Sequence, residues 1–323
     1  IMNTPNDKIE KGFLIDSCES YTKYDKVQSS KRITLTNVIL LSISAFLFFS
    51  QYSGRINARF SSFVQKSSNS EAILSRDLTN LNHLVILPGH AVLNGLSFRT
   101  NPESDEAWQL LDYQLNHDLG VTLVDQIKNA IEHASQDPKS LLVFSGGQTR
   151  PNAVPISEGL SYYSVAEYYN WWDNQEVSSR TVLEEYARDS FENLIFSIAR
   201  FYEVTKSFPD HITIVGYGFK KDRFLGQHAP AIRWPKNKIS YIGIEPLGKR
   251  FDNESAINGE LKHSVEPFRM DPYGCKSTIL SSKRSARNPY FKRPPYELSV
   301  PDMSQLLNWC EVTLFAGFLP WDV

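Results

Sequence analysis

The sequence predicts an α/β fold, a three-layer sandwich around a mainly parallel, Rossmann-like sheet, preceded by one transmembrane helix. Short apolar segments alternate with amphipathic segments after residue 83, a pattern typical of parallel strands joined by helical crossovers. Three of the apolar segments end in glycine-containing turns. One uncharged run, residues 33–54, is long enough to cross the hydrocarbon core of a bilayer. These observations define the predicted class.

The uncharged run at residues 33–54 also predicts the topology. Lys31 and Arg32 directly precede it, and the positive-inside tendency places residues 1–32 in the cytosol. A cleaved signal peptide is less favoured because the polar leader is long and shows no small-residue cleavage site. A buried core helix is disfavoured by the polar flanks. We therefore predict a single-pass type II membrane protein of the endoplasmic reticulum or Golgi. Its predicted parts are a cytosolic tail (1–32), a membrane anchor (33–54), a stalk (55–82) and a lumenal α/β domain (83–323) ending in a basic extension from about residue 249.

The first half of the domain is predicted to hold two strands and two helices. Residues 83–88 form an apolar run that ends at a Pro-Gly pair, which is typical of a strand. Residues 104–117 have an acidic start and apolar residues at helical spacing, and residues 121–134 carry an apolar face. Leu141–Phe144 is a short apolar run between turn residues and predicts a buried strand.

In the second half, predicted helices and strands continue to alternate up to residue 244, and a basic, proline-containing segment follows. Residues 157–172 begin with Ser-Glu, a helix start, and residues 188–204 form the clearest amphipathic helix. Strands are predicted at residues 212–215 and 239–244. Residues 272–296 contain several prolines and no acidic residue, which predicts an irregular basic segment. That segment is either a solvated loop or a flap that meets lipid headgroups or an anionic substrate. Residues 303–310 predict a last short helix.

Glycine turns at three strand ends predict a ligand site. They lie at Gly89, at Gly146-Gly147, and at Gly216 with Gly218. The carboxyl ends of parallel strands share one edge of a sheet, so these turns should converge on one crevice. For the Ser145-Gly146-Gly147 turn alone, a tight turn without a ligand is as well supported as a site.

Polar side chains that follow these strands suit an anionic ligand. Cations, a helix N-terminus and uncovered backbone amides favour phosphate oxygens, and carboxylates could activate a water or hold a divalent cation. The candidate catalytic residues are Glu158, Glu185, Asp189 and His90, the last as a proton donor. The candidate ligand-binding residues are Gly89, Ser145, Gly146, Gly147, Arg188, Asn193, Lys220 and Arg223. Each has a structural alternative: a helix cap for His90, a favoured helix start for Glu185, and a solvated turn for Lys220.

The composition gives no reason to expect binding to nucleic acid, and it leaves open whether two cysteines form a disulfide. The net charge is −2, so nothing predicts binding to nucleic acid. Cys275 and Cys310 both fall in the domain, and an oxidising lumen would allow them to pair, but the sequence does not show that they approach each other. P-loop, GxSxG, HExxH and GxGxxG motifs are absent.

Several short motifs in a fixed order resemble a known family. They are VILPGH, LLVFSGG, a following Ser-Glu, LEEYARDSFENL and IVGYGFKKDRF, over roughly residues 83–245. Together they are similar to the SanA/YdcF/ElyC-like family (domain of unknown function 218), and most to its fungal, membrane-anchored branch. The resemblance implies a three-layer α/β fold, a polar pocket at the strand ends, and a link to glycan precursors carried on polyprenyl phosphates. The matching positions are Gly146, Gly147, Glu158, Glu185, Glu192, Asn193 and Arg223.

The chain also departs from the bacterial pattern of that family. Residues 187–190 read Ala-Arg-Asp-Ser where the bacterial pattern tends to read Ser-x-Asn-Thr, and Lys220 stands where a histidine is common. The leading hypothesis is a hydrolase of a phosphate or diphosphate linkage, acting on a lipid-linked or phosphorylated glycan such as a dolichyl-diphosphate oligosaccharide. The alternatives are a non-catalytic module that binds a nucleotide, an adenosyl-type cofactor or a glycan, and a structural membrane protein with a vestigial pocket.

Overall fold

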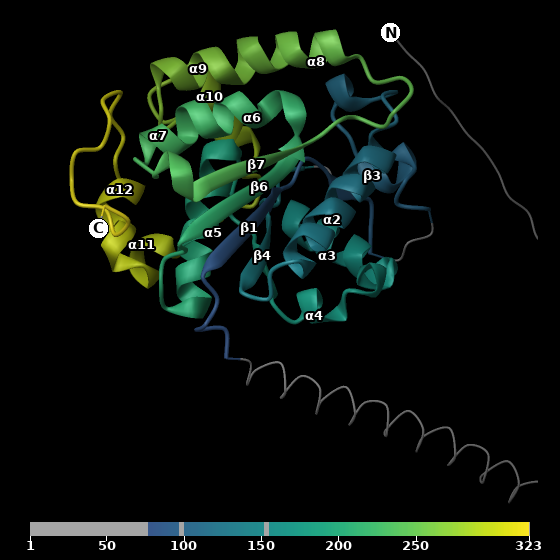
Figure 1. Cartoon of the computed structure of the whole chain (residues 1–323). Coiled ribbons are helices and arrows are strands. Elements are labelled where there is room, and N and C mark those ends of the chain that lie inside the picture. Colours follow the sequence, from purple (N-terminus) through teal and green to yellow (C-terminus); the bar gives the residue numbers. More distant parts are fainter. Residues whose placement is uncertain (1–76, 97–99, 152–154, 323) are drawn as a thin grey trace, which may run out of the picture. The chain divides into compact units, whose positions relative to one another are not determined.

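The computed structural model describes residues 77–96, 100–151 and 155–322 (Figure 1). The predicted tail, the membrane anchor and most of the stalk lie outside these residues. Within the described ranges, no helix is both long and apolar enough to cross a membrane. The described residues all belong to one compact unit.

A five-stranded sheet forms the centre of the domain, in the order β5-β4-β1-β6-β7. Its strands are β1 (His83–Pro88), β4 (Ser140–Ser145), β5 (Thr181–Glu184), β6 (His211–Tyr217) and β7 (Ile239–Ile244), and every neighbouring pair is parallel. Along the chain, β1 is followed by β4 and β5 on one side of it, and then by β6 and β7 on the other side. The prediction of an α/β fold with a parallel, Rossmann-like sheet is confirmed.

Helices cover both faces of this sheet. On one face lie α2 (Leu119–Ser135) and α3 (Glu158–Tyr168), and on the other α5 (Ser190–Thr205) with the C-terminal part of the chain (Figure 1). Alternate residues of each strand serve the two cores: Val85 packs with the α2 side and Ile86 with the α5 side. Strands buried on both faces read as continuous apolar runs, which is why β1 and β4 could be predicted.

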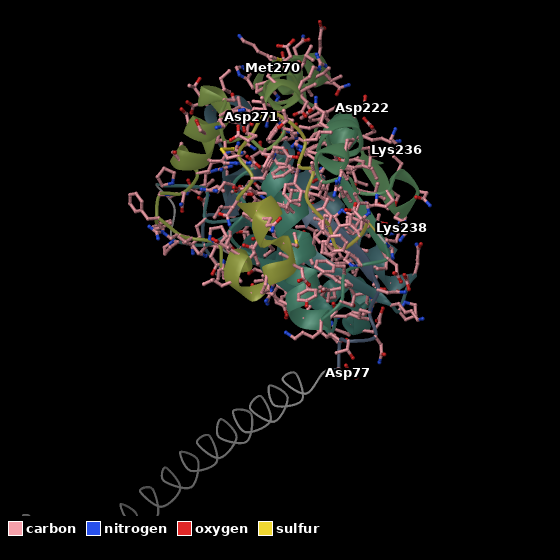
Figure 2. The ribbon with its side chains drawn as sticks, turned by 90° about the vertical axis from the view of Figure 1, so that its left-hand side faces the viewer. Asp77, Asp222, Lys236, Lys238, Met270 and Asp271 are labelled. Carbon is pink, nitrogen blue, oxygen red and sulfur yellow. A yellow bond between two sulfur atoms is a disulfide. The ribbon has the colours of Figure 1, made fainter. Side chains whose placement is uncertain are left out.

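Shorter elements complete the fold. They are β2 (Val92–Leu93), β3 (Trp108–Gln109), α4 (Gln175–Ser178), α6 (Lys221–Arg223), α7 (Ala229–Ala231), α8 (Asn253–Glu260), α9 (Glu266–Met270), α10 (Thr278–Ala286), α11 (Tyr296–Ser299) and α12 (Ser304–Leu307). The 3-10 helices are η1 (Asp105–Ala107), η2 (Asp112–Gln114), η3 (Asn170–Asp173), η4 (Gly218–Lys220), η6 (Lys236–Lys238) and η8 (Pro301–Met303), and two π-helical turns are η5 (Phe224–His228) and η7 (Leu261–Val265). Asp77 lies at the end of the domain opposite Asp222 of α6 and Met270 of α9 (Figure 2).

Three predictions about secondary structure were wrong or incomplete. Residues 104–117 form no long helix, because Trp108 and Gln109 pair with the backbone of β2 and the chain reverses through left-handed backbone at Asn116. The edge strand β5 was missed, since four residues are too few to show a period. The segment 272–296 is not irregular throughout: α10 lies between its prolines and is capped by Ser277, whose hydroxyl accepts from the Leu280 amide.

The two domain cysteines are joined. A disulfide links Cys275 to Cys310, with the Cα atoms 5.8 Å apart across 35 residues of sequence. Closing a loop of this length restricts the unfolded chain, so we expect Cys310→Ser to lower the free energy of unfolding by about 3–4 kcal/mol. Urea denaturation of the oxidised protein and of the variant measures this. Reduced wild-type protein should unfold at the same urea concentration as the variant, and equal midpoints for all three samples would contradict the prediction.

Candidate active site

A cavity of about 640 Å³ opens at the carboxyl ends of the strands. It is lined by residues that follow β1 and β6, by the first residues of α3 and α5, and by parts of α8 and α10. Between β1 and β6 the chain order reverses, and this is where open α/β sheets bind ligands. The ends of β1 and β6 therefore meet at one cavity, as predicted for parallel strands. Of the glycines in the three predicted turns, Gly89 lines the cavity, whereas Gly146, Gly147, Gly216 and Gly218 do not.

Gly89 and Gly146 pack against the side chain of Glu158, and the amides of Gly89, Gly146 and Gly147 already donate to backbone carbonyls. A Cβ at Gly89 would lie 2.4 Å from the Glu158 Cβ, and one at Gly146 would lie 2.7 Å from the same atom. The amides of Gly89, Gly146 and Gly147 donate to the carbonyls of Ser145, Glu184 and Ala187, at 2.7, 2.9 and 2.7 Å. The expectation that uncovered amides here hold phosphate oxygens is therefore wrong. These glycines instead allow α3 to approach the sheet closely.

Glu158 is buried in the space that the missing Cβ atoms of Gly89 and Gly146 leave free. It begins α3 and lines the cavity with 7% of its surface exposed. Its Oε1 accepts the Thr149 hydroxyl and lies 3.6 Å from Arg150 Nη1. Arg150 Nη2 also donates to the carbonyl of His90 at 2.9 Å, so one guanidinium fixes both Glu158 and the end of β1.

Glu184, which was not among the predicted site residues, accepts several buried hydrogen bonds next to the residues that line the cavity, and we call it the hub. It is fully buried, and it accepts from the Ser145 hydroxyl (2.7 Å), the Tyr186 amide (2.7 Å) and the Tyr296 hydroxyl (3.1 Å). Burial raises the pKa of Glu184 to about 7 in spite of these donors. Asn193 donates to both the carbonyl and the hydroxyl of Ser145, at 3.0 and 2.9 Å. Ser145 itself does not line the cavity and thus acts in this network.

Two predicted catalytic carboxylates have structural partners. Glu185 does not line the cavity, and its Oε1 accepts the hydroxyl of Ser157, the residue that caps α3, at 2.6 Å. Asp189 lines the cavity but caps α5 through Oδ1 and pairs with Arg284 through Oδ2 at 2.6 Å. Burial alone would raise the pKa of Asp189, but the charge and hydrogen bond of Arg284 outweigh this effect and lower the pKa to about 2. Neither carboxylate is placed to take a proton from water at neutral pH.

Cations dominate the cavity wall. Six basic side chains line it: Arg150, Arg188, Lys220, Arg223, Lys283 and Arg287. Arg223 Nε lies 2.9 Å from Glu260 Oε1, and Arg188 pairs with Glu192. Among the described residues, Lys220, Lys283 and Arg287 form no ion pair with a carboxylate. Lys220 contacts His90 Nδ1 at 3.3 Å, Lys283 donates to the His263 carbonyl, and Arg287 donates to the Arg188 carbonyl at 2.9 Å.

This crowding of positive charge shifts the titration of its members. Burial, followed by the charge of Arg223, lowers the pKa of Lys220 to about 7. Burial and the charge of Arg287 lower the pKa of Lys283 to about 8. Burial and Lys220 hold the pKa of His90 well below its usual range, so the imidazole is neutral at pH 7. Its Nε2 has no hydrogen-bond partner in the described part of the protein.

Three aromatic rings form the wall next to Lys220. Tyr217, Phe219 and Phe251 all line the cavity, their planes lie within 13 to 24° of parallel, and their centroids are 5.2 to 6.3 Å apart. The Lys220 ammonium lies 5.0 Å from the centre of the Tyr217 ring, a cation–π distance. The cavity thus joins a cationic part to a flat apolar part.

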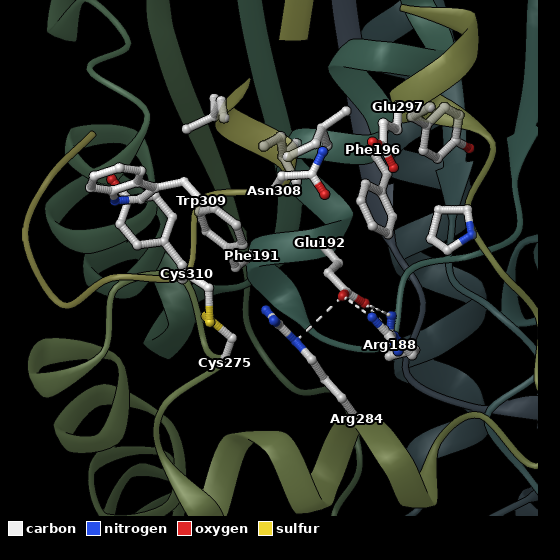
Figure 3. A pocket seen from close by; sticks show the side chains of 16 residues that line it. Arg188, Phe191, Glu192, Phe196, Cys275, Arg284, Glu297, Asn308, Trp309 and Cys310 are labelled. Carbon is white, nitrogen blue, oxygen red and sulfur yellow. Dashed lines mark hydrogen bonds and ion pairs between the residues drawn. A yellow bond between two sulfur atoms is a disulfide. The ribbon is translucent and has the colours of Figure 1, made fainter. Parts of the chain in front are cut away.

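A smaller cavity of about 330 Å³ lies behind α5. Arg188 lines both cavities, and Figure 3 shows Glu192 between Arg188 and Arg284, with the disulfide at one side. Arg284 Nε lies 3.4 Å from Glu192 Oε1. The charged groups at the centre of the smaller cavity, Arg188, Glu192 and Arg284, are paired with one another. We therefore take the main cavity as the candidate site.

The sequence allowed a divalent cation to be held by carboxylates in this site. Among residues 77–96, 100–151 and 155–322, no group of three or more His, Cys, Asp or Glu side chains could hold a metal ion. The candidate site of the described chain is a cationic cavity. Its lining includes two buried carboxylates, Glu158 beside Arg150 and Glu260 beside Arg223, and a neutral histidine, His90.

Comparison with known proteins gives a relative without a known activity. No family model matches the chain, and no solved structure matches it. The resemblance to the SanA/YdcF/ElyC-like family therefore stays a prediction. The chain is 32% identical over 266 residues to "Uncharacterized protein YOR238W" of Saccharomyces cerevisiae, a match that covers 67% of this chain and 87% of the yeast protein. This chain belongs to the same protein family as that yeast protein.

Proposed function

We propose that this protein is a hydrolase of a phosphate or diphosphate linkage in an organic phosphate, with a polyprenyl (dolichyl) diphosphate-linked oligosaccharide as the leading substrate. One observation carries the proposal: Lys220, Lys283 and Arg287 line one cavity with no carboxylate partner in the described chain. Gathering half-buried cations without a carboxylate partner is unfavourable unless an anion joins them. A phosphate group at this place would accept charge-assisted hydrogen bonds from all three.

The chemistry falls to three groups around that anion. Glu158 is the carboxylate available to orient or activate a water, because its Oε1 is held by Thr149 and Arg150 while the side chain faces the cavity. Lys220, with a pKa of about 7, suits protonation of a leaving group near neutral pH better than His90, which is already neutral. Arg223 is held by Glu260 and can contact a second phosphate.

The aromatic wall favours an organic phosphate over an inorganic one. Tyr217, Phe219 and Phe251 offer a flat apolar surface beside the cations, and such surfaces stack on bases or on the apolar faces of sugars. The same surface supports the second candidate function, a module that binds a nucleotide, an adenosyl-type cofactor or a glycan without chemistry. An intact ligand that is recovered unchanged after long incubation would favour this second function.

Membrane attachment belongs to the proposal as well. Residues 33–54 would anchor a type II protein of the endoplasmic reticulum or Golgi and hold the domain near lipid-linked glycans. This supports a substrate whose phosphate is attached to a lipid.

Full-length protein incubated with a dolichyl-diphosphate oligosaccharide, with and without Mg²⁺ or Mn²⁺, is expected to release phosphorylated or free glycan. Glu158→Gln should lower the rate by about 100-fold or more, the usual range for loss of a general base. Glu185→Gln is the matched control and should keep the rate within a few fold, since Glu185 lies outside the cavity. No product from the wild type under any of these conditions would refute the hydrolase and leave the binding module.

A further inference from the structure

We propose that Ser190 is the nucleophile of this site and that His228 is the base that accepts its proton. The inference rests on the proposed function as a phosphate-linkage hydrolase and adds a covalent step to it. Neither residue was among the predicted site residues. Ser190 is the first residue of α5 and lines the cavity, while His228 lies behind it at the end of the π-helical turn η5.

The two side chains lie within hydrogen-bond distance of each other. Ser190 Oγ lies 2.7 Å from His228 Nε2. In the tautomer of neutral His228 that carries its hydrogen on Nδ1, Nε2 accepts the hydrogen bond of the Ser190 hydroxyl, and this is the tautomer that the proposed proton transfer requires.

The surroundings of His228 keep it neutral and fixed. It is fully buried, and the rings of Phe191, Phe224 and Phe268 lie 5.8, 5.4 and 4.6 Å from its own, all edge to face. Burial and the nearby charge of Arg223 hold the pKa of His228 well below its usual range, so it is an unprotonated base at neutral pH. Arg223, a cation of the cavity wall, ends α6, and His228 ends the π-helical turn η5 that follows directly.

Two features of α5 favour attack on an anion at this place. The positive end of the helix dipole lies at Ser190, in a helix of 16 residues. Asp189 is committed to Arg284 and to the Glu192 amide, so its charge does not face an incoming phosphate uncompensated.

The proposed reaction has two steps. In the first, a bond forms between Ser190 Oγ and phosphorus, the bond from phosphorus to the leaving-group oxygen breaks, and the serine proton moves to His228 Nε2. The protonated His228 or Lys220 supplies a proton if the leaving oxygen needs one. In the second step, with His228 again neutral, a water oxygen bonds to phosphorus, the bond from phosphorus to Ser190 Oγ breaks, and the phosphate is released. The attacking water gives a proton to His228, which passes a proton to Ser190 Oγ. Water is the only co-reactant.

His228 Nδ1 has no hydrogen-bond partner in the described part of the chain. The pair therefore lacks the third group that orients and stabilises the histidine in a triad, and loss of such a group costs a triad enzyme about 10⁴ in kcat. We therefore expect a slow enzyme.

The test uses a biotinylated alkyl fluorophosphonate on the full-length protein, with the labelled peptide identified by mass spectrometry. Wild type is expected to carry one label, on Ser190. Ser190→Ala and His228→Gln should lose at least nine-tenths of it. Ser264→Ala, which changes another serine of the same cavity, should label like wild type. Binding of inorganic pyrophosphate, measured by calorimetry on each variant, shows whether the cavity is intact.

The outcomes separate this inference from the function on which it rests. Pyrophosphate binding without any label on Ser190, or a label that survives His228→Gln in a folded variant, overturns the nucleophile and leaves the anion site. Absence of pyrophosphate binding to wild type counts against the proposed function. A label that forms on Ser190 and is removed only by His228→Gln and Ser190→Ala establishes the pair.

Discussion

Replacing Glu184 by alanine is expected to lower the free energy of unfolding by about 3–5 kcal/mol, although Glu184 touches no part of the cavity. Its carboxylate accepts from Ser145, Tyr296 and the amides of Tyr186 and Ala187, and the alanine variant would leave these buried donors without an acceptor. Chemical denaturation at 25 °C measures the loss. The neighbouring Glu185→Ala is the control, with an expected loss of about 1 kcal/mol because only the bond from Ser157 disappears. Equal effects at the two positions would contradict the hub.

The conservative change Glu184→Gln adds a pH test of the same residue. The folded-state pKa of about 7 exceeds the usual value of 4.5, so the folded protein holds a proton that the unfolded chain releases between these pH values. The stabilisation is complete below pH 4.5 and is lost as the pH rises through 7, by up to about 3 kcal/mol. The glutamine variant has no such group. The free energy of unfolding of wild type, relative to that of the glutamine variant, should therefore fall as the pH rises through this window. A constant difference from pH 4 to 8 would refute the shifted pKa.

The second large effect is a fall in anion affinity as the pH rises. Sulfate resembles phosphate and keeps its charge from pH 6 to 9, so only the protein titrates. Lys220 has a pKa of about 7 in the empty cavity and Lys283 about 8, so both are largely neutral at pH 9. A charge-assisted hydrogen bond contributes about 1.5–3 kcal/mol, and loss of the two should weaken sulfate binding at least tenfold, measured by calorimetry at pH 6 and pH 9.

Single substitutions divide that pH dependence between the two lysines. Lys220→Met should bind sulfate about tenfold more weakly than wild type at pH 6 and almost equally at pH 9. Lys283→Met should keep the change centred near pH 7 and lose the part near pH 8. A wild-type affinity that does not change with pH would show that these ammonium groups do not contact the anion.

The convergence of the strand ends could be predicted because it follows from chain order alone. Parallel strands place their carboxyl ends on one edge, so His90 and Lys220, 130 residues apart, were both assigned to one crevice, and they lie 3.3 Å apart. The role of each acidic side chain could not be predicted in this way. Glu184 and Glu185 are neighbours in a short edge strand and its turn, and only the packing decides which one is buried.

The C-terminal half of the site was hidden from the sequence for another reason. Lys283 lies in α10 and Arg287 directly follows it. This helix lies between prolines and carries no acidic residues, so its charges were as well explained by a solvated loop. Their position depends on tertiary contacts such as the pair between Arg284 and Asp189, 95 residues apart. Ser190 was placed beside the crevice but given no role, and His228 was missed, because a lone serine and a lone histidine carry no motif.

The chain enters the described domain at Asp77, at the end opposite α6 and its neighbour Lys220 (Figure 2). A surface coupled to the described domain at Asp77 would therefore be attached at the end away from α6 and Lys220. Biosensor measurements with the protein captured in that orientation should give the same dissociation constants as calorimetry, whereas capture through the lysines beside the cavity should block binding.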